Sequence, residues 1–298
     1  MSLTPLNKNA NRLSFNRAAS SYDHHAVLQR EIESRLLERL EFQRIEPALI
    51  LDLGCGTGSA SESLATRFDQ SSVIALDWAI SMLAKVRAGA NPVSGAGVSR
   101  LCADMHGLPL ASRSVGLVFS NLALQWAHDL PAIFQEFRRI LKPGAMLVFT
   151  CYGPDTLHEL KQAWRAVDDL PHVNDHPDLH DIGDELVTAG FNEPVMDAER
   201  LTLEYPDVMS LMRELKGLGA HNVARQRQPG LTGKGRMKAM LDAYEQFRRD
   251  DRYPASFEVI YGAAFAPAEG QPVKTAQGDI ATFSVDALRS NSRNRGRA

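Results

Sequence analysis

Three glycines at alternate positions, directly after an apolar segment, constrain this chain more than any other feature. The apolar segment covers 48–53, and Gly54, Gly56 and Gly58 follow it. A helix-forming segment, 59–68, comes next. Glycine is needed where a backbone turns sharply and a ligand lies against it without a Cβ in between, and the next helix offers free N–H groups at its first turn. The pattern predicts a ligand-binding strand–loop–helix unit; the alternative is a tight turn without a ligand.

An acidic residue ends the next apolar segment. Segment 72–76 leads into Asp77, which lies about 25 residues after Asp52, near the offset at which an acid meets ribose hydroxyls in nucleotide-binding βαβ units. A carboxylate can accept hydrogen bonds from two vicinal hydroxyls. We therefore expect Asp77 to bind a ribose and Trp78 to pack against an adenine ring. Asp77 can also serve as the N-cap of a helix over 79–87.

Strands and helices continue to alternate as far as residue 151. We expect strands at 98–102, before Asp104 and Met105, at 114–121, which ends in Asn121, and at 145–151. A helix over 130–141 is expected to stop at the breaker Lys142-Pro143-Gly144. This alternation predicts an α/β fold, with a mostly parallel sheet and helices on both faces.

The flanking segments predict additions to this core. We expect a helical cap over 1–45, a core over 46–205, a helical lid over 206–252, and a last strand with a tail over 253–298. Within these segments we expect helices at 7–42, 152–167 and 181–189, strands at 194–205 and 257–265, and a disordered end from 289.

Composition excludes several classes of protein. The 298 residues are 44% hydrophobic, enough for one large core with additions, and the net charge of −3 gives no field that favours nucleic acid. No apolar run reaches the roughly 18 residues of a membrane span, and the polar N-terminus lacks a signal core. Cys55, Cys102 and Cys151 are an odd number, which favours reduced thiols and a cytoplasmic protein.

Histidines at spacing four invite comparison with a metal site. His172, His176 and His180 are accompanied by aspartates, but Pro171 and Pro177 interrupt any helix there. A polar connecting loop is the better interpretation, and we expect no metal.

The glycine loop resembles motif I of the class I S-adenosylmethionine-dependent methyltransferases, Asp-x-Gly-x-Gly-x-Gly. This resemblance implies a Rossmann-like fold with a mostly parallel seven-stranded sheet and S-adenosylmethionine as cofactor. In this family an Asp at the place of Asp104 contacts the adenine amino group. The cofactor-binding residues that the resemblance and the strand ends imply are Asp52, Gly54, Gly56, Gly58, Asp77, Trp78, Asp104, Met105 and Asn121.

Further blocks are similar to one subfamily. Segments 15–22 (FNRAASSY), 120–126 (SNLALQW), 162–164 (QAW) and 211–220 (LMRELKGLGA) resemble the malonyl-acyl-carrier-protein O-methyltransferases of bacterial biotin synthesis, over nearly the whole chain to about 265. The resemblance implies methyl transfer to the free carboxylate of a malonyl thioester on acyl carrier protein. The ester removes a charge that apolar acyl channels could not bury.

Such a reaction needs no general base, because a carboxylate is already ionised at neutral pH; the protein orients the groups and removes water. A bidentate Arg suits the substrate carboxylate. We expect Arg213 in this role, then Lys216, although both could belong to a solvated helix face. Tyr22 is expected to hold the carboxylate or the methionine end of the cofactor, or to be a core aromatic. Gln125 and Trp126 follow the fourth strand, where substrate-facing residues lie; plain packing is the alternative for Trp126.

Basic residues in the lid suggest where an acidic carrier protein docks. They surround a glycine-rich loop and are Arg225, Arg227, Lys234, Arg236 and Lys238. Charge density is the basis of this hypothesis, and a solvated loop is its alternative.

Three other functions use the same fold. One is a methyltransferase for a quinone ring or another small acid. Another is a protein arginine hydroxylase similar to the mitochondrial complex I assembly factor related to this subfamily. The third is a protein that binds the cofactor without transfer. The absence of a presequence and the lid block favour the malonyl enzyme over the assembly factor.

Overall fold

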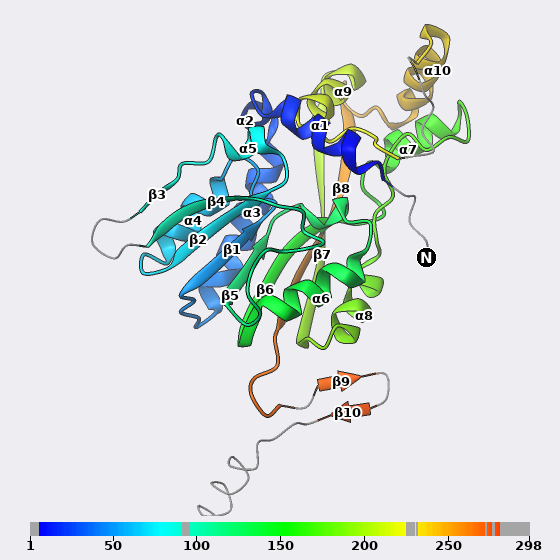
Figure 1. Cartoon of the computed structure of the whole chain (residues 1–298). Coiled ribbons are helices and arrows are strands. Elements are labelled where there is room, and N and C mark those ends of the chain that lie inside the picture. Colours follow the sequence, from blue (N-terminus) through cyan, green and yellow to red (C-terminus); the bar gives the residue numbers. More distant parts are fainter. Residues whose placement is uncertain are drawn as a thin grey trace, which may run out of the picture.

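The fold of this chain is built around one twisted β-sheet. The computed structural model describes residues 6–90, 96–224, 230, 232–271, 273–275 and 278–280. Within these residues, eight strands form the sheet in the order β3-β4-β2-β1-β5-β6-β8-β7 (Figure 1). The strands are β1 (Leu49–Leu53), β2 (Ser72–Asp77), β3 (Gly89–Ala90), β4 (Gly97–Cys102), β5 (Val115–Ser120), β6 (Leu141–Tyr152), β7 (Asn192–Tyr205) and β8 (Tyr253–Phe265).

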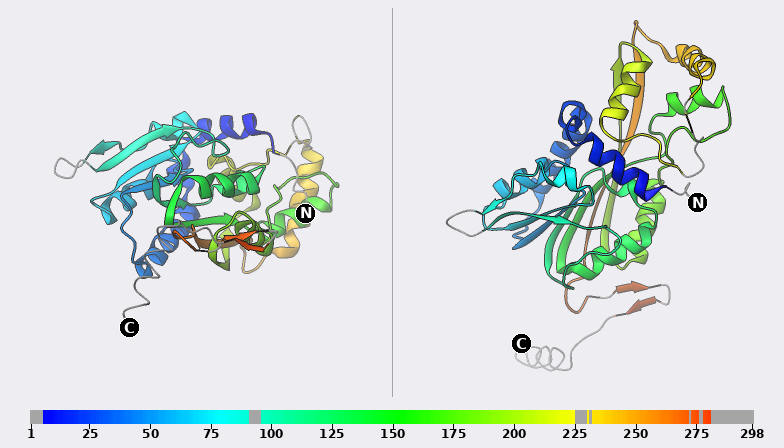
Figure 2. Two further views of the ribbon diagram at one scale, coloured as in Figure 1. Left: turned by 60° about the horizontal axis from the view of Figure 1, so that its bottom comes forward. Right: turned by 45° about the horizontal axis from the view of Figure 1, so that its top comes forward.

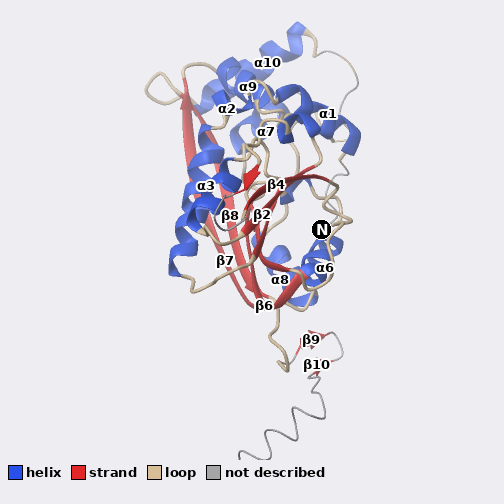
Figure 3. Cartoon of the chain, turned by 60° about the vertical axis from the view of Figure 1, so that its left-hand side comes forward, coloured by secondary structure: helices blue, strands red, loops and turns tan. Residues whose placement is uncertain are grey.

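Helices cover both faces and one end of this sheet. They are α1 (Lys8–Ala18), α2 (Tyr22–His25), α3 (Val27–Arg39), α4 (Ser59–Arg67), α5 (Ile80–Leu83), α6 (Leu130–Ile140), α7 (His158–Arg165), α8 (Leu179–Thr188), α9 (Val208–Gly217) and α10 (Lys234–Tyr244), with 3-10 turns η1 (Leu40–Phe42), η2 (Leu124–Trp126) and η3 (Glu245–Phe247). Figure 3 shows α3 on one side of the sheet and α6 and α8 on the other. The predicted α/β fold is thereby confirmed.

The strand directions are those of a mostly parallel sheet. β4, β2, β1, β5 and β6 run parallel, and β8 lies antiparallel between β6 and β7. The sheet was expected to have seven strands, which is one too few, because the two-residue β3 pairs with β4 at the edge. Gly97 makes this approach feasible, since a Cβ there would lie 1.9 Å from the Gly89 carbonyl oxygen. Glycines carry no strand signal in a sequence.

Alternate residues of the central strands pack into two separate cores, as the period of two dictates. On one face Ile50 and Phe119 join Ile32 of α3 and Leu64 of α4. On the other face Leu51 and Val118 join residues of α6 and α8, among them Phe134, Phe137, Ile182 and Leu186. Strands buried on both faces give the near-continuous apolar segments seen in the sequence.

We expected the breaker Lys142-Pro143-Gly144 to separate α6 from β6. Instead, it lies inside β6. α6 ends at Ile140, and Val115 of β5 pairs with Leu141, whereas the next paired residue, Leu117, faces Met146. The intervening residues form a bulge in the ladder, where proline and glycine are tolerated. Two helices are also shorter than predicted: α5 ends at Leu83, and α7 begins only at His158 because Tyr152 belongs to β6.

The N-terminal helices and the late helical insertion meet at one end of the sheet. In Figure 1 and in the right panel of Figure 2, α1 and α9 lie side by side there, above the carboxyl ends of the parallel strands. The Asn7 N–H donates to the Val223 carbonyl oxygen at 2.8 Å, and the Ser21 hydroxyl donates to the Gly217 carbonyl oxygen at 3.0 Å. Cap and lid therefore close over the sheet together; the four-part division of the chain stays a prediction.

A small hairpin, β9 (Val273–Thr275) with β10 (Gly278–Ile280), lies at the opposite end (Figure 1). The sequence did not predict it, and the expected disordered end from 289 lies outside the described residues. No helix in the described part of the chain is long and apolar enough to span a membrane.

Candidate functional site

The glycine loop after β1 takes a path that other residues would not permit. Gly54, Gly56 and Gly58 all have positive φ angles. A Cβ on Gly54 would lie 2.3 Å from the Cβ of Ala123, which belongs to the segment after β5. The loop is therefore packed against the neighbouring strand end, and glycine is required there both for conformation and for space.

Asp77 ties this loop to the end of β2. Its carboxylate accepts hydrogen bonds from the backbone N–H of Gly56 at 3.1 Å and of Ala79 at 2.8 Å. Burial raises the pKa of Asp77 to about 6, although the hydrogen bonds from the backbone oppose this. The group is ionised at neutral pH and can accept from a ligand.

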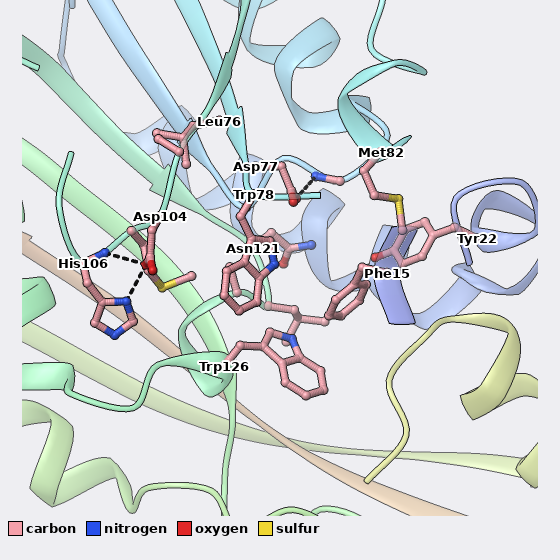
Figure 4. A pocket seen from close by; sticks show the side chains of 16 residues that line it. Phe15, Tyr22, Leu76, Asp77, Trp78, Met82, Asp104, His106, Asn121 and Trp126 are labelled. Atoms are coloured by element: carbon pink, nitrogen blue, oxygen red, sulfur yellow. Dashed lines mark hydrogen bonds and ion pairs between the residues drawn. The ribbon is translucent and has the colours of Figure 1, made fainter. Parts of the chain in front are cut away.

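A cavity that we call the first cavity opens at the carboxyl ends of β1, β2, β4 and β5. It measures about 660 Å³ including its mouth. Its wall contains most of the predicted cofactor residues, namely Gly54, Gly56, Asp77, Trp78, Asp104, Met105 and Asn121. Figure 4 shows Trp78 and Asn121 at its centre, with Tyr22 and Met82 to one side. The tertiary structure thus brings together polar strand ends that are far apart in sequence.

Aromatic rings from the cap narrow the mouth of the first cavity. Phe15 of α1 meets Trp126 edge to face, with ring centroids 5.3 Å apart and planes at 84° (Figure 4). Tyr22 of α2 also lines the cavity, and its predicted role toward the cofactor or the carboxylate stays a prediction. Burial, and the nearby carboxylate of Asp77, raise the pKa of the Tyr22 hydroxyl, so it stays protonated.

Three predicted residues lie elsewhere in the described part of the chain. Asp52 is buried beneath α4, where it accepts a hydrogen bond from the Ser61 hydroxyl, and burial raises its pKa to about 7. Gly58 is the N-cap residue of α4 and packs against Val86. The Gln125 amide donates to the Leu122 carbonyl oxygen at 2.6 Å instead of facing a cavity. Asp52 and Gln125 line neither cavity and hydrogen-bond within the loops around the site, so their contact with a ligand or substrate stays a prediction.

Asp104 is held from two sides. Lys8 of α1 reaches it at 3.1 Å, and the backbone N–H and ring of His106 contact it at 3.0 and 2.6 Å. Burial alone would raise the pKa of Asp104, but these hydrogen bonds outweigh it and lower the pKa to about 2. Lys8, Phe15 and Met82 were missed by sequence reasoning, because they belong to helices whose contact with the strand ends exists only in the folded chain.

A larger hollow, the second cavity, adjoins the first and shares Trp126 with it. It measures about 1490 Å³ including its mouth and is lined by α3, α7, α9 and the loops at 172–176 and 218–222. Its wall is mostly apolar and includes Leu28, Leu157, Leu160, Met209, Met212 and Phe257. Gln29, Tyr152 and His176, which sequence reasoning did not select, add polar groups.

The two predicted carboxylate ligands belong to the wall of this second cavity. Arg213 and Lys216 both line it from α9. The Arg213 side chain is 67% exposed and pairs with Asp207 at 3.3 Å. Its guanidinium therefore lies at the rim rather than in the interior.

The histidines of the 172–180 segment have separate environments. His172 stacks on Trp164 at 3.8 Å and contacts Asp168 at 2.9 Å, whereas His180 contacts Asp178. Among the residues that the structure describes, no group of three His, Cys, Asp or Glu side chains could hold a metal ion.

The predicted docking residues are only partly described. Arg236 pairs with Asp168, and Lys238 pairs with Asp242 at 2.6 Å on the surface of α10, which begins at Lys234. Arg225 and Arg227 lie outside the described residues.

Comparison with known proteins identifies the family. Residues 51–149 match a methyltransferase domain family. A protein of Gallionella capsiferriformans is 48% identical over 267 residues, covering 88% of this chain and 92% of its own length. A Methylovorus protein is 50% identical over 260 residues, covering 86% and 88%. Both are named malonyl-[acyl-carrier protein] O-methyltransferase. This chain belongs to the malonyl-[acyl-carrier protein] O-methyltransferase family.

Solved structures agree on the fold. A methyltransferase of Bacillus halodurans aligns with a TM-score of 0.56 at 15% identity, covering 79% of this chain and 99% of its own. The YcgJ protein of Bacillus subtilis aligns with a TM-score of 0.54 at 15% identity, covering 79% of this chain and 98% of its own. The predicted family and methyltransferase fold are thereby confirmed.

The malonyl-[acyl-carrier protein] O-methyltransferase family uses S-adenosylmethionine, and the first cavity fits this cofactor. An ionised carboxylate at Asp77 suits ribose hydroxyls, and the Asp104 carboxylate suits an amino group. The absence of a Cβ on Gly56 leaves backbone open toward Tyr22, 3.9 Å from where that Cβ would stand. These are the features that a nucleoside with an amino-acid tail requires.

Proposed function

We propose that this protein transfers the methyl group of S-adenosylmethionine to the free carboxylate of malonyl-acyl carrier protein. The product is a malonyl methyl ester, which enters fatty-acid synthesis and becomes the pimeloyl part of biotin. The names of relatives 48 and 50% identical to this chain support the reaction. The observation that carries the proposal is the adjacency of two cavities at Trp126: one fits the cofactor and the other has room for an acyl thioester.

The residues of the first cavity would hold the cofactor as follows. Asp77 accepts from the ribose hydroxyls, Asp104 from the adenine amino group, and Trp78 packs on the ring. The glycine loop and Tyr22 face the methionine end. When bound, the cofactor supplies a methyl group activated by its sulfonium. Phe15 and Trp126 exclude water between the two cavities, which favours an in-line displacement.

The second cavity explains how a carrier-bound substrate reaches the methyl group. A malonyl group fills only a small part of about 1490 Å³, and the apolar wall suits the thioester arm behind it. Arg213 and Lys216 at its wall can meet polar groups of that arm or of the carrier.

The docking surface belongs to this proposal. Acyl carrier proteins are acidic in this family's chemistry, and Lys234, Arg236 and Lys238 place positive charge on α10, with Arg225 and Arg227 preceding it in sequence. Basic rim residues speed encounter with an acidic partner. Arg236 also holds Asp168, so Lys234 and Lys238 are the sharper targets.

The reaction is tested with labelled S-adenosylmethionine and malonyl-acyl carrier protein, beside malonyl-coenzyme A, free malonate and acetyl-acyl carrier protein. We expect a base-labile ester on the malonyl carrier and none on the acetyl carrier. Failure to transfer label to the malonyl carrier, with cofactor binding intact, would overturn the proposed function.

The docking surface is tested by Lys234→Glu with Lys238→Glu. We expect KM for malonyl-acyl carrier protein to rise about tenfold at low salt, less at high salt, with kcat unchanged. The matched control is Arg44→Glu with Lys142→Glu, which reverses two exposed charges near the amino ends of β1 and β6. Equal KM values for the two double variants would contradict the surface.

A further inference from the structure

A small polar cluster, formed by Gln29, Tyr152 and His176, interrupts the apolar wall of the second cavity. Gln29 comes from α3, Tyr152 ends β6, and His176 lies in the loop before α8. The Gln29 Nε2 donates to the Tyr152 hydroxyl oxygen at 3.3 Å, and the rings of Tyr152 and His176 have centroids 5.8 Å apart. Three distant segments thus place their polar atoms together.

Two atoms of this cluster are buried without a hydrogen-bond partner among the described residues. They are Gln29 Oε1 and His176 Nδ1. A buried polar atom without a partner costs about 1–3 kcal/mol, and each such atom calls for an explanation. A carboxylate oxygen in the cavity can satisfy His176 Nδ1 when that atom carries the ring proton, but it cannot satisfy Gln29 Oε1, which only accepts. The cluster therefore has the character of a binding subsite rather than of ordinary core.

The cluster offers hydrogen bonds without a full charge. Burial lowers the pKa of His176 to about 3, with a further contribution from Lys161, so the ring is neutral and carries one N–H. Burial raises the pKa of Tyr152, so its hydroxyl keeps its proton. Two charged groups that act on His176 and Tyr152 are engaged elsewhere: Lys161 donates to the Pro154 carbonyl oxygen, and Glu214 accepts from the Tyr205 hydroxyl at 2.9 Å.

The cluster lies next to the first cavity. The Asn121 amide, in the wall of the first cavity, donates to the backbone carbonyl oxygen of Gln29 at 3.1 Å. Tyr152 ends β6, the strand paired with β5. A group bound by the cluster therefore stands beside the methyl donor's site.

We propose that Tyr152, positioned by Gln29, and His176 bind the carboxylate of the acyl substrate through uncharged hydrogen-bond donors. This assignment rests on the proposed function and replaces Arg213 in the role of carboxylate ligand. In the reaction a carboxylate oxygen forms the new C–O bond, the methyl carbon's bond to sulfur breaks with its electron pair kept by sulfur, and no proton moves.

Uncharged donors suit this chemistry better than a buried guanidinium. The substrate loses its charge on methylation, so a buried Arg would be left as an uncompensated ion in the product complex. A strong ion pair would also stabilise the carboxylate more before transfer than during it, which raises the barrier. Hydroxyl and imidazole N–H groups lose far less when the anion becomes an ester.

The test compares Tyr152→Phe with wild type in three measurements: kcat/KM for malonyl-acyl carrier protein, inhibition by acetyl-acyl carrier protein, and binding of S-adenosylhomocysteine. We expect kcat/KM to fall at least tenfold, while the other two stay within twofold, because the acetyl group lacks the carboxylate. Tyr253→Phe is the matched control, since its hydroxyl contacts Glu245 on the exterior rather than lining either cavity.

His176→Gln tests the same subsite independently if Tyr152→Phe lowers the stability of the fold. We expect the same selective loss of kcat/KM for malonyl-acyl carrier protein. Unchanged kcat/KM in the folded variants, or equal weakening of malonyl and acetyl carriers, would overturn the proposal. So would loss of malonyl selectivity in Arg213→Ala alone. Absence of transfer by the wild type is a different result, because it would count against the proposed function itself.

Discussion

Asn121 and Gln29 are joined by a hydrogen bond of 3.1 Å, from the side-chain amide of the first to the backbone carbonyl oxygen of the second. Asn121 lines the first cavity and Gln29 the second. Asn121 also accepts from the Thr150 hydroxyl at 2.7 Å. The Asn121 side chain thus fixes the end of β5, the end of β6 and helix α3 relative to one another. It thereby fixes the positions of the two cavities relative to each other.

Cofactor binding should depend on the charge of Asp77. Asp77→Asn is expected to weaken S-adenosylhomocysteine binding about 10–100-fold, because an amide is a poorer acceptor than a carboxylate. The wild-type pKa of about 6 means that the carboxylate becomes protonated as pH falls through 6, so wild-type affinity should fall there and stay constant above pH 7. Calorimetry from pH 5 to 8 measures both. Wild-type affinity that does not change between pH 5 and 8, or affinity of the variant that does change with pH, would contradict a role for the charge of Asp77 in cofactor binding.

Gly54 and Gly144 allow the stability cost of backbone conformation to be measured apart from the cost of a packing clash. Gly54 and Gly144 have nearly equal φ angles of +72° and +74°, but a Cβ on Gly144 meets nothing within 4 Å. Gly144→Ala should cost about 1 kcal/mol of unfolding free energy, from the left-handed conformation alone. Gly54→Ala should cost about 1–3 kcal/mol more, because its Cβ clashes with Ala123, and should abolish cofactor binding. Denaturant unfolding compares them, and equal losses would refute the packing argument.

Asp52 should weaken the fold as pH rises. Its pKa of about 7 in the folded protein exceeds the ordinary value of 3.8, so the native state binds an extra proton between these values. Stability is therefore lost as pH rises from about 4 to 7. Asp52→Asn keeps an acceptor for Ser61 without this titration, and should raise the melting temperature by on the order of 5 °C at pH 8 but little at pH 4. A gain independent of pH would show that burial of the charge is not the cause.

Asp168 connects the lid to the wall of the second cavity. It pairs with Arg236 of α10 and contacts His172, whose ring stacks on Trp164. Asp168→Asn should loosen this contact and raise KM for malonyl-acyl carrier protein several-fold. Binding of S-adenosylhomocysteine should stay unchanged, because the first cavity is formed by other elements. Steady-state kinetics and calorimetry check the pair of results; a loss of cofactor affinity would place the effect elsewhere.

The core of the fold was predictable because its signals are local. Apolar segments of strand length, each followed by glycine, an acid or asparagine, predicted β1, β2, β4 and β5 and the edge at which Asp77, Asp104 and Asn121 meet. The edge strand β3 and the bulge in β6 were not predictable, since they arise from pairing between backbones and not from side-chain pattern. Likewise, nothing near Asp52 or Gln125 in the sequence distinguishes a ligand contact from a hydrogen bond to Ser61 or to the Leu122 carbonyl oxygen.

The sequence by itself determined the fold class, the cofactor loop and the family, because strand periodicity, glycine spacing and the motif blocks are properties of contiguous residues. Only the tertiary structure decided which side chains share a cavity. Gln29 meets Tyr152 and His176 although it lies more than a hundred residues before them, and Arg213, expected to hold the substrate carboxylate, lies at the rim. The physical reason is that burial and unpartnered polar atoms depend on how the cap, sheet and lid pack together, and packing brings residues together without regard to their distance along the chain.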